Sequence, residues 1–104
     1  MEKRIEKRAP HFMDLVYGDS DTFSPGQTRN ISGHGILIQS EYQIFPINHE
    51  VNILLTIGNE PVSLKGIVCW NSEYTGREAM AEKQLGLFIP DPPLQYVDYI
   101  SHLN

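Results

Sequence analysis

The chain has 104 residues, enough for one domain with a modest hydrophobic core and too few for two. Hydrophobic residues make up 40% of it, which argues against global disorder. Thirteen acidic and eight basic side chains give a formal net charge of −5, and half of the basic ones lie within residues 1–8. Because the rest of the chain is strongly acidic, it would repel a long polyanion, and general DNA or RNA binding is disfavoured. A small anion held by the basic N-terminal segment remains compatible with these charges.

In chain order, residues 1–10 are expected to form a flexible basic arm, in which Ala9 and Pro10 interrupt regular structure. Turn or loop residues are expected at 18–21, 24–26 and 58–61, and a solvated loop at 71–83. Alternating apolar residues change parity at Gly66, which predicts a bulge or kink there. The predicted strands are 11–17, 27–31, 36–39, 51–57, 62–70 and 84–89.

The hydrophobic period changes after the last strand. Asp91 is a plausible helix N-cap, with Pro92 at the first helical position. The sequence therefore predicts a C-terminal helix over 91–103 that covers a barrel mouth or a sheet face. Its apolar face is expected to carry Leu94, Val97, Ile100 and Leu103.

Six or seven short strands with regular turns predict an all-β domain, a small antiparallel barrel at 11–89 followed by that helix. Cys69 is the only cysteine, which excludes an intramolecular disulfide, and it is expected to be buried. Five aromatic side chains are expected in the core: Phe12, Tyr17, Phe45, Trp70 and Phe88. With no membrane-length apolar run and no signal peptide, we expect a soluble cytoplasmic protein.

Two short motifs carry the most chemistry. Arg4 and Arg8 are four residues apart, and guanidinium groups form paired hydrogen bonds with phosphates and with the O6/N7 edge of guanine. Asn30 and Ser32 are two residues apart, so in a strand they face the same side and could bind one ligand edge together. Gly35 would let a ligand or a neighbouring strand approach the backbone closely.

In this order the motifs match RxxxR followed by (D/N)xSxxG, and the chain resembles the PilZ domain family of bacterial receptors for cyclic di-GMP. The apolar strand after Gly35, the strand end Val68-Cys69-Trp70 and the segment 85–88 also resemble the family, so the resemblance covers essentially the whole chain. It implies a PilZ-like barrel that binds cyclic di-GMP, needs no other cofactor and has no catalytic activity.

The resemblance also implies a role for each motif residue. Arg4 and Arg8 would hold phosphate and guanine, Asn30 and Ser32 would bind a guanine edge, and Gly35 would shape the turn. The arm would become ordered over the turn when ligand binds, and a lone domain of this kind would signal through a protein partner. No metal site is expected, because the four histidines share no metal-ligand spacing.

Two other functions are compatible with the sequence. The first is a PilZ-like adaptor that binds a protein and uses the motif only structurally. The second is an oligonucleotide-binding barrel, which the acidic body disfavours. An enzyme is the least favoured class, because no pair of carboxylates is marked out for acid–base chemistry and Gly-x-Ser-x-Gly is absent.

Overall fold

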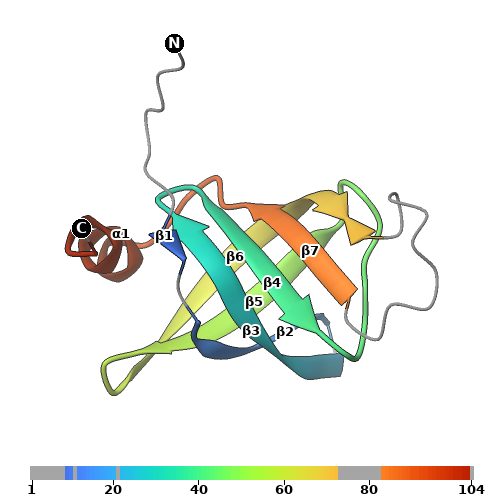
Figure 1. The fold of residues 1–104 in the computed structure, drawn as a ribbon, viewed down its shortest axis with the longest axis horizontal. Helices are drawn as coiled ribbons and strands as arrows, with labels where there is room; N and C mark the ends of the chain where they lie inside the picture. The colour runs from blue at the N-terminus through green and yellow to red at the C-terminus, as the bar shows by residue number, and fades with distance from the viewer. Residues whose placement is uncertain (1–8, 11, 21, 73–82, 104) are drawn as a thin grey trace, which may run out of the picture.

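The computed structural model describes residues 9–10, 12–20, 22–72 and 83–103. These residues form seven strands and one helix (Figure 1). The elements are β1 (Ala9–Pro10), β2 (Asp14–Asp19), β3 (Thr22–Ser32), β4 (Gly35–Ser40), β5 (Glu50–Ile57), β6 (Glu60–Asn71), β7 (Lys83–Phe88) and α1 (Leu94–Ser101).

Strands β2 to β7 form a closed antiparallel barrel, in the order β3-β2-β5-β6-β7-β4. The barrel closes because β3 pairs with β2 along one edge and with β4 along the other. The short β1 continues the first of these edges, where Ala9 and Pro10 pair with Ile31 and Asn30. The predicted all-β antiparallel barrel with a C-terminal helix is thus confirmed.

The core lies inside the barrel and under α1, because inward and outward side chains alternate along each strand. Branched aliphatic side chains dominate it, as expected for inward positions of a small barrel. The buried hydrophobic residues are Leu15, Tyr17, Ile31, Ile36, Ile38, Phe45, Val51, Ile53, Leu55, Val62, Leu64, Val68, Leu85, Leu87, Ile89 and Tyr96.

Two register shifts interrupt the ladders. In the β3–β4 ladder the shift falls between Thr28 and Asn30, and in the β6–β7 ladder it falls between Val68 and Trp70. At each shift one residue is added to the strand. The residue before it, Thr28 or Val68, is fully buried, and the two residues that follow Thr28 or Val68 are not. Each bulge therefore turns two consecutive side chains to the outside of the barrel, where strict alternation would turn one.

The bulge in β6 lies three residues beyond the predicted position. Gly66 continues the inward alternation and is buried, and a Cβ there would lie 3.2 Å from both Ile89 Cδ1 and Leu87 Cβ. The apparent change of parity at Gly66 arises because the inward position there is occupied by a glycine and not by an apolar side chain.

Other strand predictions need correction. Ala9 and Pro10 form β1; proline is tolerated because this is a sheet edge. The predicted loop at 24–26 lies within β3, opposite residues 15–17 of β2. Most of the predicted loop at 71–83, together with residues 1–8 of the predicted arm, lies outside the described residues.

The prediction of buried aromatics is right for Tyr17 and Phe45 and wrong for the other three. Phe12 precedes β2 and is 61% exposed, and Phe88 occupies an outward position of β7. Trp70 and Cys69 are exposed because the β6 bulge turns both outward. Cys69 is therefore not the buried residue that its apolar neighbours suggested.

The helix α1 begins at Leu94, and its N-cap is Pro93, with no side-chain cap. The prediction that Asp91 caps it is wrong, and so are the predicted positions of Leu94 and Val97, which are 81% and 41% exposed. The buried residue is Tyr96; residues 99, 100 and 103 pack beside it, at helical spacings of three, four and seven. Tyrosine takes this place because its ring is apolar and its hydroxyl finds a carbonyl partner.

Within the described part of the chain, the helix is far too short and polar to cross a membrane.

Candidate functional site

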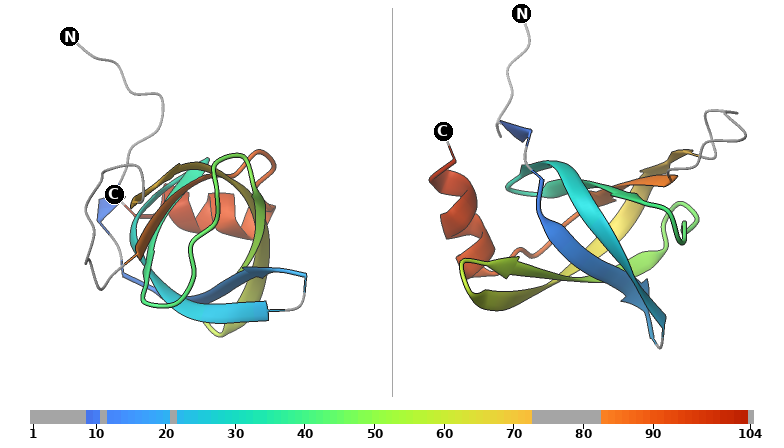
Figure 2. Two further views of the ribbon diagram at one scale, coloured as in Figure 1. Left: turned by 90° about the vertical axis from the view of Figure 1, so that its right-hand side faces the viewer. Right: turned by 60° about the horizontal axis from the view of Figure 1, so that its bottom comes forward.

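The Asn30–Gly35 motif forms the hairpin between β3 and β4. Ser32 pairs with Gly35 across a two-residue loop, and Asn30 pairs with Leu37. This turn lies at the end of the barrel where β1 and α1 also lie, as Figure 1 and the right-hand view of Figure 2 show. The motif is therefore next to both the start of the described chain and its last helix.

The structure brings Asn30 and Ser32 to the same side of β3, since Ile31 between them points into the core. Their exposure differs: Asn30 is half-buried, whereas Ser32 is only 5% exposed. The Ser32 hydroxyl donates a long hydrogen bond of 3.5 Å to the Gly35 carbonyl. Asn30 thus offers an amide at the surface, and Ser32 lies beneath the turn.

Gly35 allows a close approach of two groups. A Cβ there would lie 3.3 Å from the Ser32 Oγ and 3.5 Å from the Leu87 carbonyl oxygen on β7. The predicted role of this glycine in shaping the turn fits these distances, because any side chain would press on the Ser32 hydroxyl.

The other two predicted residues, Arg4 and Arg8, lie outside the described residues. The described chain nevertheless begins beside the motif, because Ala9 pairs with Ile31 and Pro10 with Asn30. Arg8 is bonded covalently to Ala9, so its backbone is attached within one residue of this pairing.

The helix α1 contacts the motif through Tyr96. The Tyr96 hydroxyl donates to the Ser32 carbonyl at 2.7 Å and lies 3.4 Å from the Gly35 carbonyl. Its side chain is completely buried. No local pattern connects residue 96 with a motif 64 positions away, and this link is a finding of the structure.

Arg29 is a second residue that the motif analysis missed. The guanidinium donates to the Gln39 side-chain oxygen on β4 and lies 5.4 Å from the centre of the Phe12 ring. The β3 bulge places Arg29 next to Asn30 on the outside of the barrel. The sequence signal that could have pointed to Arg29 is its position as a basic residue directly before the (D/N)xSxxG pattern.

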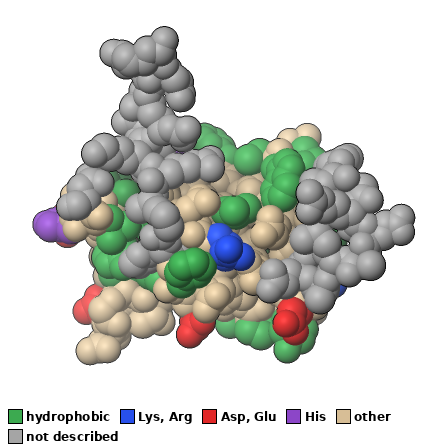
Figure 3. Space-filling model, viewed as in Figure 1, with side chains coloured by type: hydrophobic (Ala, Val, Ile, Leu, Met, Phe, Trp, Pro, Cys, Tyr) green, Lys and Arg blue, Asp and Glu red, His purple; other side chains and the backbone are tan. Residues whose placement is uncertain are grey.

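The two bulges lie at the same level of the barrel. Asn30 pairs with Leu37, Leu37 with Gly86, and Gly86 with Trp70, so one row crosses β3, β4, β7 and β6. A hollow of about 230 Å³ lies along it, where Gly86 has no side chain between Leu37 and Trp70. We call this row, together with the added residue of each bulge, the bulged face: Arg29, Asn30, Leu37, Gly86, Cys69 and Trp70. Figure 3 shows basic side-chain atoms among hydrophobic ones on the face over β4 and β7.

A family model for the PilZ domain matches residues 2–102. The chain belongs to the PilZ domain family. The match includes all five predicted motif residues, and it extends through α1. No curated protein sequence matches the chain significantly.

Solved PilZ-type structures share the fold. The Bacillus subtilis inhibitor of motility, MotI/DgrA, superposes with a TM-score of 0.76 at 11% identity, over 96% of this chain and 48% of that one. The PilZ domain of CeSA from a cellulose-synthesizing bacterium gives a TM-score of 0.64 at 16% identity, over 93% of both chains. This chain therefore spans about half the length of the motility inhibitor.

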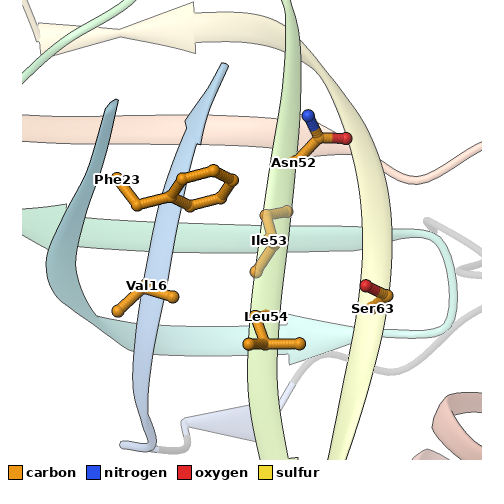
Figure 4. A pocket seen from close by; sticks show the side chains of 6 residues that line it. All are labelled: Val16, Phe23, Asn52, Ile53, Leu54 and Ser63. Atoms are coloured by element: carbon orange, nitrogen blue, oxygen red, sulfur yellow. The ribbon is translucent and has the colours of Figure 1, made fainter. Parts of the chain in front are cut away.

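The PilZ barrel has a second hollow, of about 360 Å³, on another part of its outer surface (Figure 4). The ring of Phe23 reaches from β3 across β2, where its partner Gly18 has no side chain. We call this the regular face: Val16, Phe23, Asn52, Leu54 and Ser63, outward residues of β2, β3, β5 and β6. None of these five side chains is charged, and the nearest cation on this side is Lys65 of β6, opposite Asn52.

Proposed function

We propose that this PilZ domain is a receptor for cyclic di-GMP that changes the conformation of its N-terminal arm on binding and has no catalytic activity. The pairing of β1 with the motif strand is the observation that carries the proposal. The residues that directly follow the RxxxR segment pair with Ile31 and Asn30, although about twenty residues separate the two motifs in sequence.

Both arginines are within reach of the motif. Arg8 precedes Ala9 directly, and Arg4 is five residues from it, a span of at most about 18 Å when extended. An arginine side chain adds several ångströms to that reach, so both guanidiniums can return to the Asn30–Gly35 turn. Arg4 and Arg8 would bind phosphate and guanine, while Asn30 and Ser32 would bind a guanine edge.

The signal would pass to a protein partner in the bacterial cytoplasm. Ligand held between the arm and the barrel would create a surface that the free protein lacks, which is a general route from binding to output. The cost of ordering the arm, about 1–2 kcal/mol per residue, would keep the affinity below the sum of its contacts.

Calorimetric titration with cyclic di-GMP and cyclic di-AMP tests the proposal. We expect binding of the guanine dinucleotide and much weaker binding of the adenine one, because adenine has an amino donor where guanine has the O6 acceptor. Equal affinity for the two ligands, or no binding of either, would contradict the proposal.

The arginines should carry much of the binding energy. Arg4→Ala or Arg8→Ala should weaken binding about tenfold to a hundredfold, since each charge-assisted contact is worth roughly 1.5–3 kcal/mol. Lysine should restore little, because it lacks the planar fork. Lys65→Ala is the matched control: it removes a cation from β6, opposite Asn52, and should leave the affinity unchanged.

The adaptor function is the second candidate, and the burial of Ser32 favours it. A hydroxyl that is 5% exposed and bonded to the Gly35 carbonyl has a structural use that requires no ligand. If Arg8→Ala bound cyclic di-GMP normally while Ser32→Ala melted the domain, the motif would be structural. The adaptor function would then replace the receptor function.

A further inference from the structure

We propose that Arg29 is a third cation of the ligand site, fixed on the barrel wall, where it binds a phosphate of the cyclic dinucleotide. This inference rests on the proposed function and extends it to a residue outside both motifs. Four observations support it: the bulge, the anchoring of the guanidinium, its remaining donors and its charge environment.

The bulge gives Arg29 its position. Thr28 and Ile31 are fully buried, whereas Arg29 and Asn30 between them are not. In a regular strand these two neighbours would face opposite sides of the sheet. The register shift between Thr28 and Asn30 instead places both side chains on the outside, so the guanidinium and the amide share one surface.

Two contacts hold the guanidinium in place. Gln39 on β4 accepts a hydrogen bond from it, and the guanidinium carbon lies over the Phe12 ring, 5.4 Å from its centre. A side chain held in this way loses little further freedom when it binds, so its contact with a ligand is made at low entropic cost. Arg4 and Arg8, by contrast, would have to be brought to the site with the arm.

The guanidinium has donors left for a ligand. It carries five N–H groups, and Gln39 offers it one side-chain oxygen. The Phe12 side chain, whose ring centre lies 5.4 Å from the guanidinium carbon, has no oxygen or nitrogen that could accept from the remaining N–H groups. Two parallel N–H groups on such an edge match two oxygens of a phosphodiester.

The charge of Arg29 is not neutralised by a carboxylate within the described residues. There, the one contact between a basic side chain and a carboxylate joins His49 Nε2 to Asp19, at 2.9 Å. The Asp14 carboxylate instead accepts from the Gln27 side chain, one outward position along β3 from Arg29. A half-buried cation that has no carboxylate partner among the described residues, next to Asn30, favours an anionic ligand.

The test compares Arg29→Gln, Arg29→Lys and Lys65→Gln in calorimetric titrations with cyclic di-GMP at low and high salt. We expect Arg29→Gln to weaken binding by about tenfold and to make the affinity less dependent on salt. Arg29→Lys keeps the charge, so it should retain more affinity and the wild-type salt dependence. Lys65→Gln removes a cation of the same charge elsewhere and should bind like wild type.

The outcomes separate the two proposals. If wild type binds and Arg29→Gln binds equally well, the role of Arg29 is wrong and the receptor function stands. If Arg29→Lys and Arg29→Gln lose affinity and thermal stability together, with unchanged salt dependence, Arg29 only supports the bulge and the inference is overturned. If wild type does not bind, the receptor function fails, and the inference fails with it.

Discussion

The bulged face and the regular face lie on one barrel and both contain exposed apolar side chains, but their strand pairing differs. On the regular face the ladders β2–β3, β2–β5 and β5–β6 run without a register shift. On the bulged face the ladders β3–β4 and β6–β7 each contain one. Regular pairing turns one side chain in two outward, and the residues that line the hollow there are uncharged.

The bulges change what the surface offers. Each adds an outward side chain, so that Arg29 joins Asn30 on β3 and Cys69 joins Trp70 on β6. The bulged face therefore has a cation and an amide beside the motif turn, which are the groups that our proposal assigns to a nucleotide. In that proposal, irregular pairing marks the ligand-binding side of the barrel.

The largest expected effect is on the stability of the regular face. A Cβ at Gly18 would lie 1.9 Å from the Thr22 carbonyl oxygen, so Gly18→Ala must move backbone and should cost about 3 kcal/mol or more. Gly86→Ala is the matched change on the bulged face. Its Cβ would meet Trp70 Cβ at 3.4 Å, an ordinary contact, and should change stability by no more than about 1 kcal/mol.

Chemical denaturation of the two glycine variants measures this difference. Similar losses in both would show that the two faces do not differ in how tightly their backbones are packed. The two faces would then differ only in the side chains that they expose.

The next effect concerns the link between α1 and the motif. Tyr96→Phe removes the hydroxyl that donates to the Ser32 carbonyl and should cost about 1–2 kcal/mol of unfolding free energy, because a buried hydrogen bond is lost. Leu94→Ala, at the most exposed apolar residue of the helix, is the control and should stay within about 0.5 kcal/mol. Equal losses in the two variants would mean that the hydrogen bond contributes nothing.

The sequence predicted the parts of the fold that depend on alternation. The strands in the second half of the barrel, the hairpin at Asn30–Gly35 and the existence of a C-terminal helix all follow from local apolar patterns and turn residues. It failed where packing between distant segments decides the outcome. Tyr96 was passed over because its partner is the Ser32 carbonyl, which no local pattern reveals.

The same distinction applies to the site. The (D/N)xSxxG pattern located Asn30, Ser32 and Gly35 correctly at one turn, while Arg29 went unnoticed. In a strand without a bulge, Arg29 and Asn30 would point to opposite faces of the sheet. Only the register between β3 and β4 shows that they share a surface. Likewise, the sequence predicts Trp70 in the core, because its outward orientation depends on the pairing of β6 with β7.

Ser32→Ala should affect binding less than loss of either motif arginine. A neutral hydroxyl contributes roughly 0.5–1.5 kcal/mol, about half of a charge-assisted contact, and Ser32 is nearly buried. Calorimetry on the variant, beside Arg8→Ala, measures the ratio. A larger loss for the serine than for the arginine would reverse the assignment of the binding energy.

The smallest expected effect is a substitution on the regular face. Leu54→Gln replaces an exposed apolar side chain of β5 and should change the affinity for cyclic di-GMP by less than about twofold, since it touches neither the bulges nor the motif. A clear loss of affinity in this variant would extend the ligand site to the regular face.

The most direct test of the central claim is an NMR titration of the isotope-labelled protein with cyclic di-GMP, followed by amide chemical shifts. We expect the largest changes at residues 29–35 of the β3–β4 hairpin and at 84–88 of β7, together with changes in residues 1–8. Residues 15–18 of β2 and 52–55 of β5 should shift little. Changes centred on those two strands, with the hairpin unaffected, would contradict the assignment of the nucleotide site to the bulged face.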